Sequence, residues 1–475
     1  MNEDIWKVKI SAYLHDPATK TIILLRGIDH EEGSVKELRK RLFNYDEEIH
    51  RYQNIIKKAD HLSASADRIE IPKNIKTKVS FIKDPELIHP LTGQIFNLIS
   101  LERYEELTPD NIEKINFEHF KNFIVKRDNR IDWKATFLSF WRFGQASAPA
   151  KGLGLLWQEL PADTRCPDHS IWEHLSLTSA FAGAMTEEDQ MPALLLMSFG
   201  PVQGFISQAR SVSDLWAGSH LLSQMCWEGM RVICNEYGPD AIIFPNLYGV
   251  PVVDLWIKEE IKNWHEDVEF PKGVSDFNPV FGAALPNRFV AIVPESQAEE
   301  LALKAMKKVR EWVRKQAEKV LDQLTLNSSL IAIKQIRRQF NEFPEVNWAV
   351  VPWNLAGTER DLEDERLKDL LAHMGAKRSY MDEDIYNILK KEIKVQEVEF
   401  YTPNPGIGYP GLYELLERFH ASVKSSRTFE GTQERGYRCS ICGEREWLTD
   451  DETLLMRPPG KRKGSIWEGL YNQGR

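Results

Sequence analysis

Apolar residues recur three and four positions apart through the first 144 residues of the chain. The segment VKELRKRLFNYDEEIHRYQNIIKKADHLSASADR at 35–68 shows the pattern clearly, because charged residues fill most positions between the apolar ones. This spacing is typical of helices that bury one face. We therefore expect a helical unit at residues 1–190, interrupted at 145–170 by a long loop rich in Gly, Pro, Ala and Ser.

The pattern changes after Met191, where short continuous apolar runs replace the helical spacing. Four such runs predict buried strands: PALLLMSF, DAIIFPN, NRFVAIVP and NWAVVPW. Two long amphipathic segments lie between them, after the first strand and after the third. The resulting order β-α-β-β-α-β predicts a ferredoxin-like unit at residues 191–355.

The two amphipathic segments each carry a recognisable buried face and a boundary signal. The first predicts a helix that ends at Gly238, with one apolar face formed by Leu222, Met225, Cys226, Gly229 and Ile233. The second predicts a helix capped by Ser296, with one face formed by Leu301, Ala305, Val309, Trp312, Val313, Val320 and Leu324.

The remainder of the chain is predicted to be a helical domain at 356–430 and a partial zinc ribbon at 431–475. The fold class is thus a multidomain α+β protein: a helical domain, a ferredoxin-like domain, a helical insert and the start of a metal-binding ribbon.

Composition restricts the class of protein. The 475 residues carry a formal charge of −10, which argues against binding of nucleic acid by bulk electrostatics. A basic loop at Arg457–Lys463, followed by Trp467 and Tyr471, is the candidate for a local RNA contact, with a solvated loop as the alternative. Five cysteines indicate a reducing, cytoplasmic setting. No apolar stretch is long enough for a membrane span.

Candidate metal ligands lie in three predicted helical segments. His15 and Asp16 follow an apolar helical stretch and precede Pro17, and an adjacent imidazole and carboxylate suit Mn, Fe, Ni or Mg. Further candidates are Asp60, Asp67, Asp168 and His174. For Asp60 and Asp67 a solvated helix face is the alternative, and we expect His61 and His169 to lie outside the ligand set. Ser170 is predicted to cap the helix that carries His174.

Two further motifs follow the first predicted strand and begin the last predicted domain. Gly200 and Gly204 permit close backbone approach, and the helix start after them could receive a phosphate; an ordinary strand-to-helix turn is the alternative. Cys439 and Cys442 form a CxxC knuckle, half of the ligand set of a structural zinc. Cys226 and Cys234 are expected in the core.

The ordered set of motifs resembles the large polymerase/cyclase-like subunit of type III-B (Cmr) CRISPR effector complexes. The segments that carry the resemblance are LHDP, ADHLSASADR, LPADTRCPDHSIWEHLSLT, GPVQGFISQAR with DLWAGSHLLS, LPNRF and GYRCSICG. They extend along essentially the whole chain.

This resemblance implies an N-terminal HD domain that cuts single-stranded DNA with divalent metals (Mn, Ni or Mg) at His15, Asp16, Asp60, Asp168 and His174. It also implies that the ferredoxin-like unit is a first palm domain that contributes to ATP binding, with contacts expected at Gly200, Gln203, Gly204, Asp214 and Ser219. The implied partners are other Cmr subunits, CRISPR RNA and target RNA, which activates the nuclease in the family.

One departure limits these expectations. The family's Gly-Gly-Asp-Asp motif is absent, and the Asp pair near the end is Asp450–Asp451, so cyclic-oligoadenylate synthesis is not expected of this chain alone. We interpret the sequence as the front part of a longer protein. Two alternatives remain: a catalytically silent nucleotide-binding scaffold of the same complex, and an HD phosphohydrolase acting on free nucleotides.

Overall fold

A computed structural model describes most of the chain. The described residues are 3–23, 33–43, 46–68, 86–89, 92–97, 109–146, 157–163, 168–187, 190–266, 268–270, 278–324, 329–341, 343–357, 362, 364–427, 434–440, 442–463 and 465–472. Asp67 is described as backbone only, so its prediction as a ligand lies outside the described side chains.

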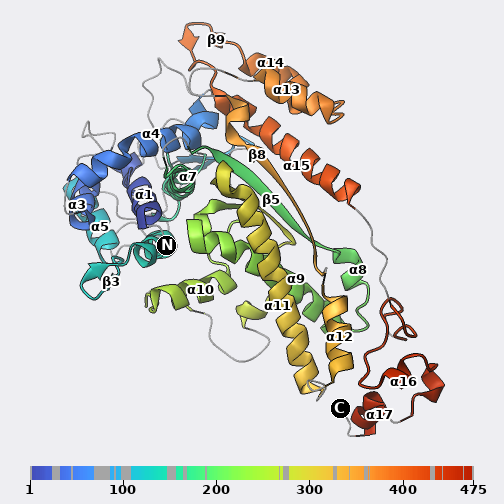
Figure 1. Ribbon diagram of the computed structural model, residues 1–475. Coiled ribbons are helices and arrows are strands. Elements are labelled where there is room, and N and C mark those ends of the chain that lie inside the picture. The colour runs from blue at the N-terminus through green and yellow to red at the C-terminus, as the bar shows by residue number, and fades with distance from the viewer. Residues whose placement is uncertain are drawn as a thin grey trace.

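The N-terminal part is mainly helical, as the apolar spacing predicts (Figure 1). Its helices are α1 (Glu3–Tyr13), α2 (Lys20–Ile23), α3 (Ser34–Leu42), α4 (Asp46–Arg68), α5 (Pro109–Lys121), α6 (Trp133–Ala146) and α7 (Ile171–Ala184).

Two hairpins interrupt these helices: β1 (Glu86–Ile88) with β2 (Ile95–Asn97), and β3 (Lys126–Arg127) with β4 (Arg130–Ile131). A purely helical N-terminal unit was therefore wrong at these places. For the second hairpin the physical reason is turn chemistry, because Asp128 and Asn129 both adopt positive φ and form a two-residue connection.

The second part is built on a four-stranded antiparallel sheet. Its elements are β5 (Pro192–Gly200), α8 (Val202–Ile206), α9 (Val212–Tyr237), η4 (Pro239–Ala241), β6 (Ile242–Phe244), α10 (Pro251–Ile261), η5 (Pro279–Phe281), β7 (Arg288–Pro294), η6 (Glu295–Gln297), α11 (Ala298–Gln323), α12 (Leu330–Gln339), β8 (Glu345–Pro352) and η7 (Trp353–Ala356). The strand order is β6-β7-β5-β8, which is the order that a β-α-β-β-α-β ferredoxin-like arrangement requires.

Helices cover both faces of this sheet, which explains the continuous apolar sequence of its central strand β5. Leu195, Met197 and Phe199 belong to one core, together with apolar residues of α1, α6, α9 and α11. Leu194 and Leu196 belong to a second core, with residues of α4, α7 and the helices that follow the sheet. Both cores therefore cross the predicted domain boundary at residue 190.

The C-terminal part consists of short elements and one long helix. They are α13 (Asp364–His373), η8 (Tyr380–Asp382), α14 (Asp384–Leu389), β9 (Lys394–Val395), β10 (Val398–Glu399), η9 (Pro405–Gly408), α15 (Tyr409–Ser426), α16 (Glu452–Leu455), η10 (Pro459–Lys461) and α17 (Ile466–Asn472). Helix α15 packs on β8, while α16 and α17 lie at the far end of the molecule from the N-terminal helices (Figure 1).

Helices α9 and α11 differ in how well the sequence describes them. The predicted face of α9 is buried and Gly238, with φ 87°, follows the helix as expected. In α11, Ser296 lies in η6 and the N-cap position is Gln297, so the predicted cap was wrong. Val320 is also half exposed, because the buried row continues from Val313 through Ala317 to Leu321.

Candidate metal centre

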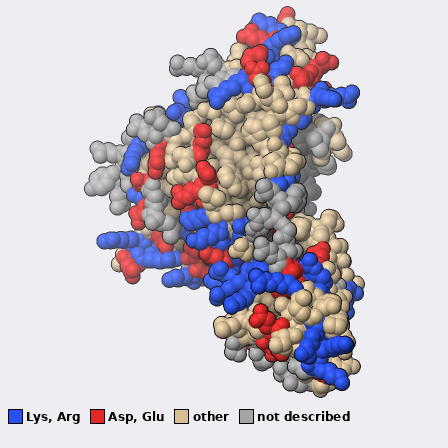
Figure 2. Space-filling model, turned by 45° about the vertical axis from the view of Figure 1, so that its right-hand side comes forward, with Lys and Arg blue, Asp and Glu red and all other residues tan. Residues whose placement is uncertain are grey.

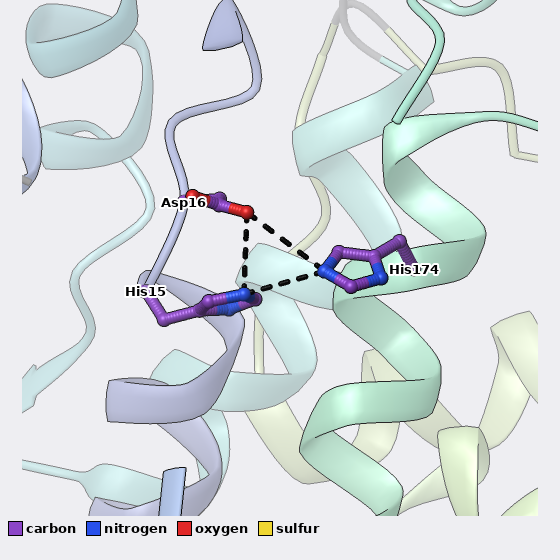
Figure 3. A group of neighbouring side chains, drawn as sticks. All are labelled: His15, Asp16 and His174. Atoms are coloured by element: carbon purple, nitrogen blue, oxygen red, sulfur yellow. Dashed lines mark hydrogen bonds and ion pairs between the residues drawn. The ribbon is translucent and has the colours of Figure 1, made fainter. Parts of the chain in front are cut away.

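Two histidines and two aspartates converge from three segments that are distant in the sequence. His15 and Asp16 follow α1 and His174 lies on α7 (Figure 3), while Asp60 lies on α4. His15 Nε2 is 3.3 Å from Asp16 Oδ2, 3.5 Å from Asp60 Oδ1 and 3.3 Å from His174 Nε2. His174 Nε2 is 3.3 Å from Asp60 Oδ1 and 3.8 Å from Asp16 Oδ2. We refer to these four residues as the HD cluster.

Helix ends place the two histidines. Helix α1 ends at Tyr13, so His15 and Asp16 lie in the short segment between the end of this helix and Pro17. Helix α7 begins with a capping box in which the Ser170 hydroxyl accepts from the backbone N–H of Glu173 and the Glu173 carboxylate accepts from that of Ser170. The predicted cap at Ser170 is therefore confirmed, and it fixes the helical turn that carries His174.

Hydrogen bonds orient the His15 ring. Its Nδ1 is 2.7 Å from the backbone oxygen of Ala12. Because a carbonyl oxygen only accepts, Nδ1 must carry the hydrogen, and Nε2 is the nitrogen directed at the cluster.

The His174 ring is oriented through Ser63, which lies one helical turn after Asp60. The Ser63 hydroxyl donates to the backbone oxygen of Asp60 at 2.9 Å, so its lone pairs accept from His174 Nδ1 at 3.4 Å. Thr178 lies 2.8 Å from the same hydroxyl. Nε2 of His174 is thereby left as the coordinating nitrogen, a form of support typical of metal-binding histidines.

Opposing effects set the protonation of the cluster. Burial alone would lower the pKa of His15, but the charge and hydrogen bond of Asp16 and those of Asp60 outweigh it and raise this pKa to about 9. Burial lowers the pKa of His174, with hydrogen bonding to Asp60 acting in the opposite direction. Burial would raise the pKa of Asp60, yet its contacts with His15 and His174 hold that pKa well below its usual range. Without a metal, the cluster thus contains a protonated His15, a neutral His174 and an ionised Asp60.

The donor set of the cluster suits a divalent cation. Imidazole and carboxylate are ligands of Mn, Fe, Ni and Mg, and the ligand atoms of His15, Asp16 and His174 all lie within 4.8 Å of one another. Asp60 adds a second carboxylate and is the most accessible member, with 28% of its side chain exposed. Lys20 lies one turn after Asp16 and pairs with its Oδ2 at 2.5 Å, a contact that the sequence analysis missed.

Asp168, the fifth residue expected at the site, pairs with His169 Nδ1 at 2.7 Å, just before α7. His61 lies next to Asp60 on α4. The structure therefore brings together four of the five residues expected at the metal site.

The residues expected to contact a nucleotide lie at the end of β5 and on α8 and α9. Gln203, Gly204 and Asp214 are exposed. Asp214 Oδ2 accepts from the backbone N–H of Arg210 at 3.1 Å, and Ser219 donates to the backbone oxygen of Leu215 at 2.9 Å. Gly200 ends β5 and precedes the short helix α8. The side chains of Asp214 and Ser219 thus serve local backbone contacts.

The Cys439–Cys442 knuckle forms a tight turn. The Cys439 N–H donates to the Arg445 oxygen at 2.6 Å, and Gly443, with φ 68°, donates to the Cys439 oxygen at 2.9 Å. Burial would raise the pKa of Cys442, but backbone hydrogen bonds near Arg445 and Glu444 outweigh it and lower this pKa. Cys226 and Cys234 are buried, as expected.

The basic side chains of the C-terminal loop differ in their surroundings: most are exposed, and one packs on an aromatic ring. Figure 2 shows Lys and Arg side chains gathered in the lower half of the view, toward the C-terminal elements. Arg457, Lys461 and Lys463 are exposed, whereas Arg462 lies over the Trp447 ring at 4.1 Å. Asp451 caps α16 by accepting from Thr453 N–H at 2.8 Å, which gives this acid a structural role.

A buried ion pair connects α1 to the sheet domain. Lys9 Nζ lies 2.6 Å from Asp240 Oδ2, and both side chains are fully buried. Lys9 also donates to the Ser179 oxygen on α7 at 3.3 Å and lies over the Phe137 ring at 4.8 Å. The pair therefore connects helices α1 and α7 to η4, next to β6.

Within the described residues, no helix is both long and apolar enough to cross a membrane.

Comparisons with known proteins agree in the family they indicate. Residues 194–322 match the family model described as CRISPR-associated protein Cmr2, N-terminal. Cmr subunit Cmr2 of Pyrococcus furiosus is 26% identical, over 92% of this chain and 52% of that protein. Cmr2 of Saccharolobus solfataricus is 24% identical, over 56% of this chain and 26% of that protein. The chain thus spans about half the length of the first relative.

Solved structures of type III-B Cmr-beta share the fold. The apo state is similar with a TM-score of 0.50 and 18% identity, over 82% of this chain and 43% of that chain. The state bound to cognate target RNA is similar with a TM-score of 0.51 and 19% identity, over 77% and 39% of the two chains. The family model and both relatives agree with one another: the chain is similar to Cmr2, a subunit of CRISPR Cmr systems, and it shares the fold of the Cmr-beta structures.

Proposed function

We propose that this chain is part of the large subunit of a type III-B effector complex and carries a divalent-metal-dependent nuclease that cuts single-stranded DNA. The observation that carries the proposal is the convergence of His15, Asp16, Asp60 and His174, with their Nε2 and Oδ atoms 3.3–3.8 Å apart. The expected partners are other Cmr subunits, CRISPR RNA and the target RNA that activates cleavage.

The residues of the chain have distinct parts in this reaction. His15, Asp16, Asp60 and His174 would hold the cation, which when bound lowers the pKa of water and stabilises charge on a phosphodiester. Ala12 and Ser63 orient the two rings so that Nε2 faces the cluster. Asp60, as the accessible member, marks the side from which a substrate would approach.

The ferredoxin-like domain is proposed to act as a palm that contributes to ATP binding near Gly200 and Gly204. The support is the strand order and the match of residues 194–322 to the N-terminal Cmr2 model. A structural zinc at Cys439 and Cys442 is likewise a proposal, supported by the tight turn of the knuckle.

The decisive experiment measures cleavage of single-stranded DNA with Mn²⁺, with and without partner subunits and target RNA. The His15→Ala/Asp16→Ala variant should lose cleavage while assembly and RNA binding remain. His61→Ala is the matched control, since it removes an imidazole next to Asp60 that is not among the grouped ligands, and it should retain activity. Cleavage that survives in the double variant would refute the assignment.

A second candidate function is a catalytically silent scaffold of the same complex. One observation favours it: Lys20 and a protonated His15 already balance the charge of Asp16 and Asp60 without a metal. Metal analysis separates the two candidates, since an active centre requires a cation at the HD cluster and a silent one does not.

A further inference from the structure

A cavity of about 710 Å³ lies between the N-terminal helices and the sheet domain. It is lined from α4 and α7 on one side, and from the segment 239–248, η7 and α15 on the other. His174 belongs to both the cavity wall and the HD cluster. The cavity therefore directly adjoins the proposed cleavage centre, and its size is in the range of small-molecule sites.

Aromatic side chains dominate the cavity wall. Trp141 and Tyr248 form one edge-to-face pair, with ring centroids 5.8 Å apart. Trp353 and Tyr409 form another, at 4.8 Å. Tyr413, on α15 one turn after Tyr409, lines the same cavity and is 39% exposed. Such rings provide flat surfaces on which a nucleobase can stack.

The charge of the wall determines which part of a nucleotide enters. Asp168 and Glu173 are acidic and line the cavity, so the cavity disfavours phosphate and favours the exocyclic amino groups of nucleobases.

We infer that this cavity is a nucleobase-binding site, in which a base stacks on the aromatic wall beside the cleavage centre. This inference rests on the proposed nuclease only for the source of the base. If the nuclease proposal holds, the base belongs to a nucleotide of the DNA strand; a free nucleotide would present the same base to the cavity.

The test uses 2-aminopurine, whose fluorescence is quenched on stacking, and the purified chain without metal. One arm titrates a short oligothymidine strand with a single 2-aminopurine, and the other titrates 2-aminopurine nucleoside monophosphate. Quenching is expected, and Tyr413→Ala or Tyr248→Ala should weaken Kd about 5- to 100-fold, the range for loss of one stacked ring. Tyr413→Phe and Tyr248→Phe are matched controls that keep the ring and should bind like wild type.

The two arms identify the source of the base. Binding of the strand much tighter than the free nucleotide assigns the site to the substrate strand, and equal binding assigns it to a free nucleotide. Absence of quenching in both arms overturns the inference, as does quenching that neither alanine variant changes while circular dichroism shows both to be folded.

The His15→Ala/Asp16→Ala variant separates this inference from the nuclease proposal. It should retain quenching, because neither residue lines the cavity. Quenching without any cleavage in the wild-type complex would leave the base site standing and refute the nuclease, whereas cleavage without quenching would do the opposite.

Discussion

The chain contains two candidate metal centres that are built in opposite ways. The HD cluster draws its four candidate ligands from the segment after α1 and from α4 and α7, and their polar atoms lie close together because these helices pack against one another. The Cys439–Cys442 knuckle is formed by one tight turn whose nearby core is the small group Trp447, Leu454 and Leu455. The first therefore depends on tertiary structure and the second on local backbone, and each should respond to a different perturbation.

The largest expected effect comes from Asp240→Ala, which leaves the buried amino group of Lys9 without its carboxylate partner. Breaking one partner of a buried ion pair costs about 3–5 kcal/mol of unfolding free energy. Because Lys9 lies on α1 and contacts α7, Mn²⁺ binding at the HD cluster should weaken too. Chemical denaturation and calorimetric metal titration measure the two effects.

Glu236→Ala is the matched control for Asp240→Ala, because Glu236 pairs with Lys304 at the surface, where ion pairs contribute about 0–1 kcal/mol. If the two variants lose the same stability, the buried pair does not support the HD cluster in the way described.

The next effect concerns pH, and the two centres should respond with opposite sign. The pKa of His15 is raised from 6.5 to about 9. Its stabilisation is fully present below pH 6.5 and is lost as pH rises through 9, on the order of 3 kcal/mol in the metal-free protein. The pKa of Cys442 is lowered in the folded protein, so its thiolate adds to the unfolding free energy as pH rises. Unfolding titrations from pH 6 to pH 9 check this.

His15→Gln is the control for the pH experiment, since glutamine does not titrate. The decline of stability between pH 6.5 and pH 9 should flatten in this variant. An unchanged decline would place the titrating group elsewhere.

The sequence predicts the local parts of this comparison well. The LHDP segment, the cap at Ser170 and the CxxC knuckle are short-range patterns whose geometry follows from neighbouring residues. The four strands and the face of α9 followed from periodicity and burial. Asp60 was a candidate from the sequence, but the approach of α4 to α7 that places it beside His174 is a property of packing.

Other features had weak or no sequence signal. Asp168 was expected among the ligands because the resemblance placed its segment on a family motif, and the structure pairs it with His169. Lys20 could have been found from its i,i+4 spacing to Asp16. Lys9 lies in an apolar helical stretch, a hint of burial, but its partner Asp240 is 231 positions away. Pairing at such distance has no trace in a single sequence.

A smaller effect is expected from Ser63→Ala, which removes the acceptor for His174 Nδ1. Loss of such a supporting hydrogen bond lowers metal affinity about 10-fold or somewhat more. Ser65→Ala is the matched control, because the Ser65 hydroxyl donates to the backbone of its own helix at His61. Calorimetry with Mn²⁺ measures both, and equal affinities would show that Ser63 does not orient the ring.

The smallest effect on the whole protein is expected from Cys439→Ser/Cys442→Ser. Both residues are only partly buried, so unfolding free energy should change by less than about 1 kcal/mol while Mn²⁺ binding at the HD cluster stays as in wild type. Any zinc held by the knuckle should be released. A large loss of Mn²⁺ affinity would show that the two centres are coupled.

The strand β5, buried on both faces, also limits how the molecule can be divided. A fragment ending near residue 187 would carry Lys9 without Asp240 and would expose the apolar side of α7 that packs on β7. The complementary fragment would expose Leu194 and Leu196, which belong to the core shared with α4 and α7. The helices that carry the HD cluster are therefore not a transferable module: grafting them onto another protein would require a replacement for the sheet.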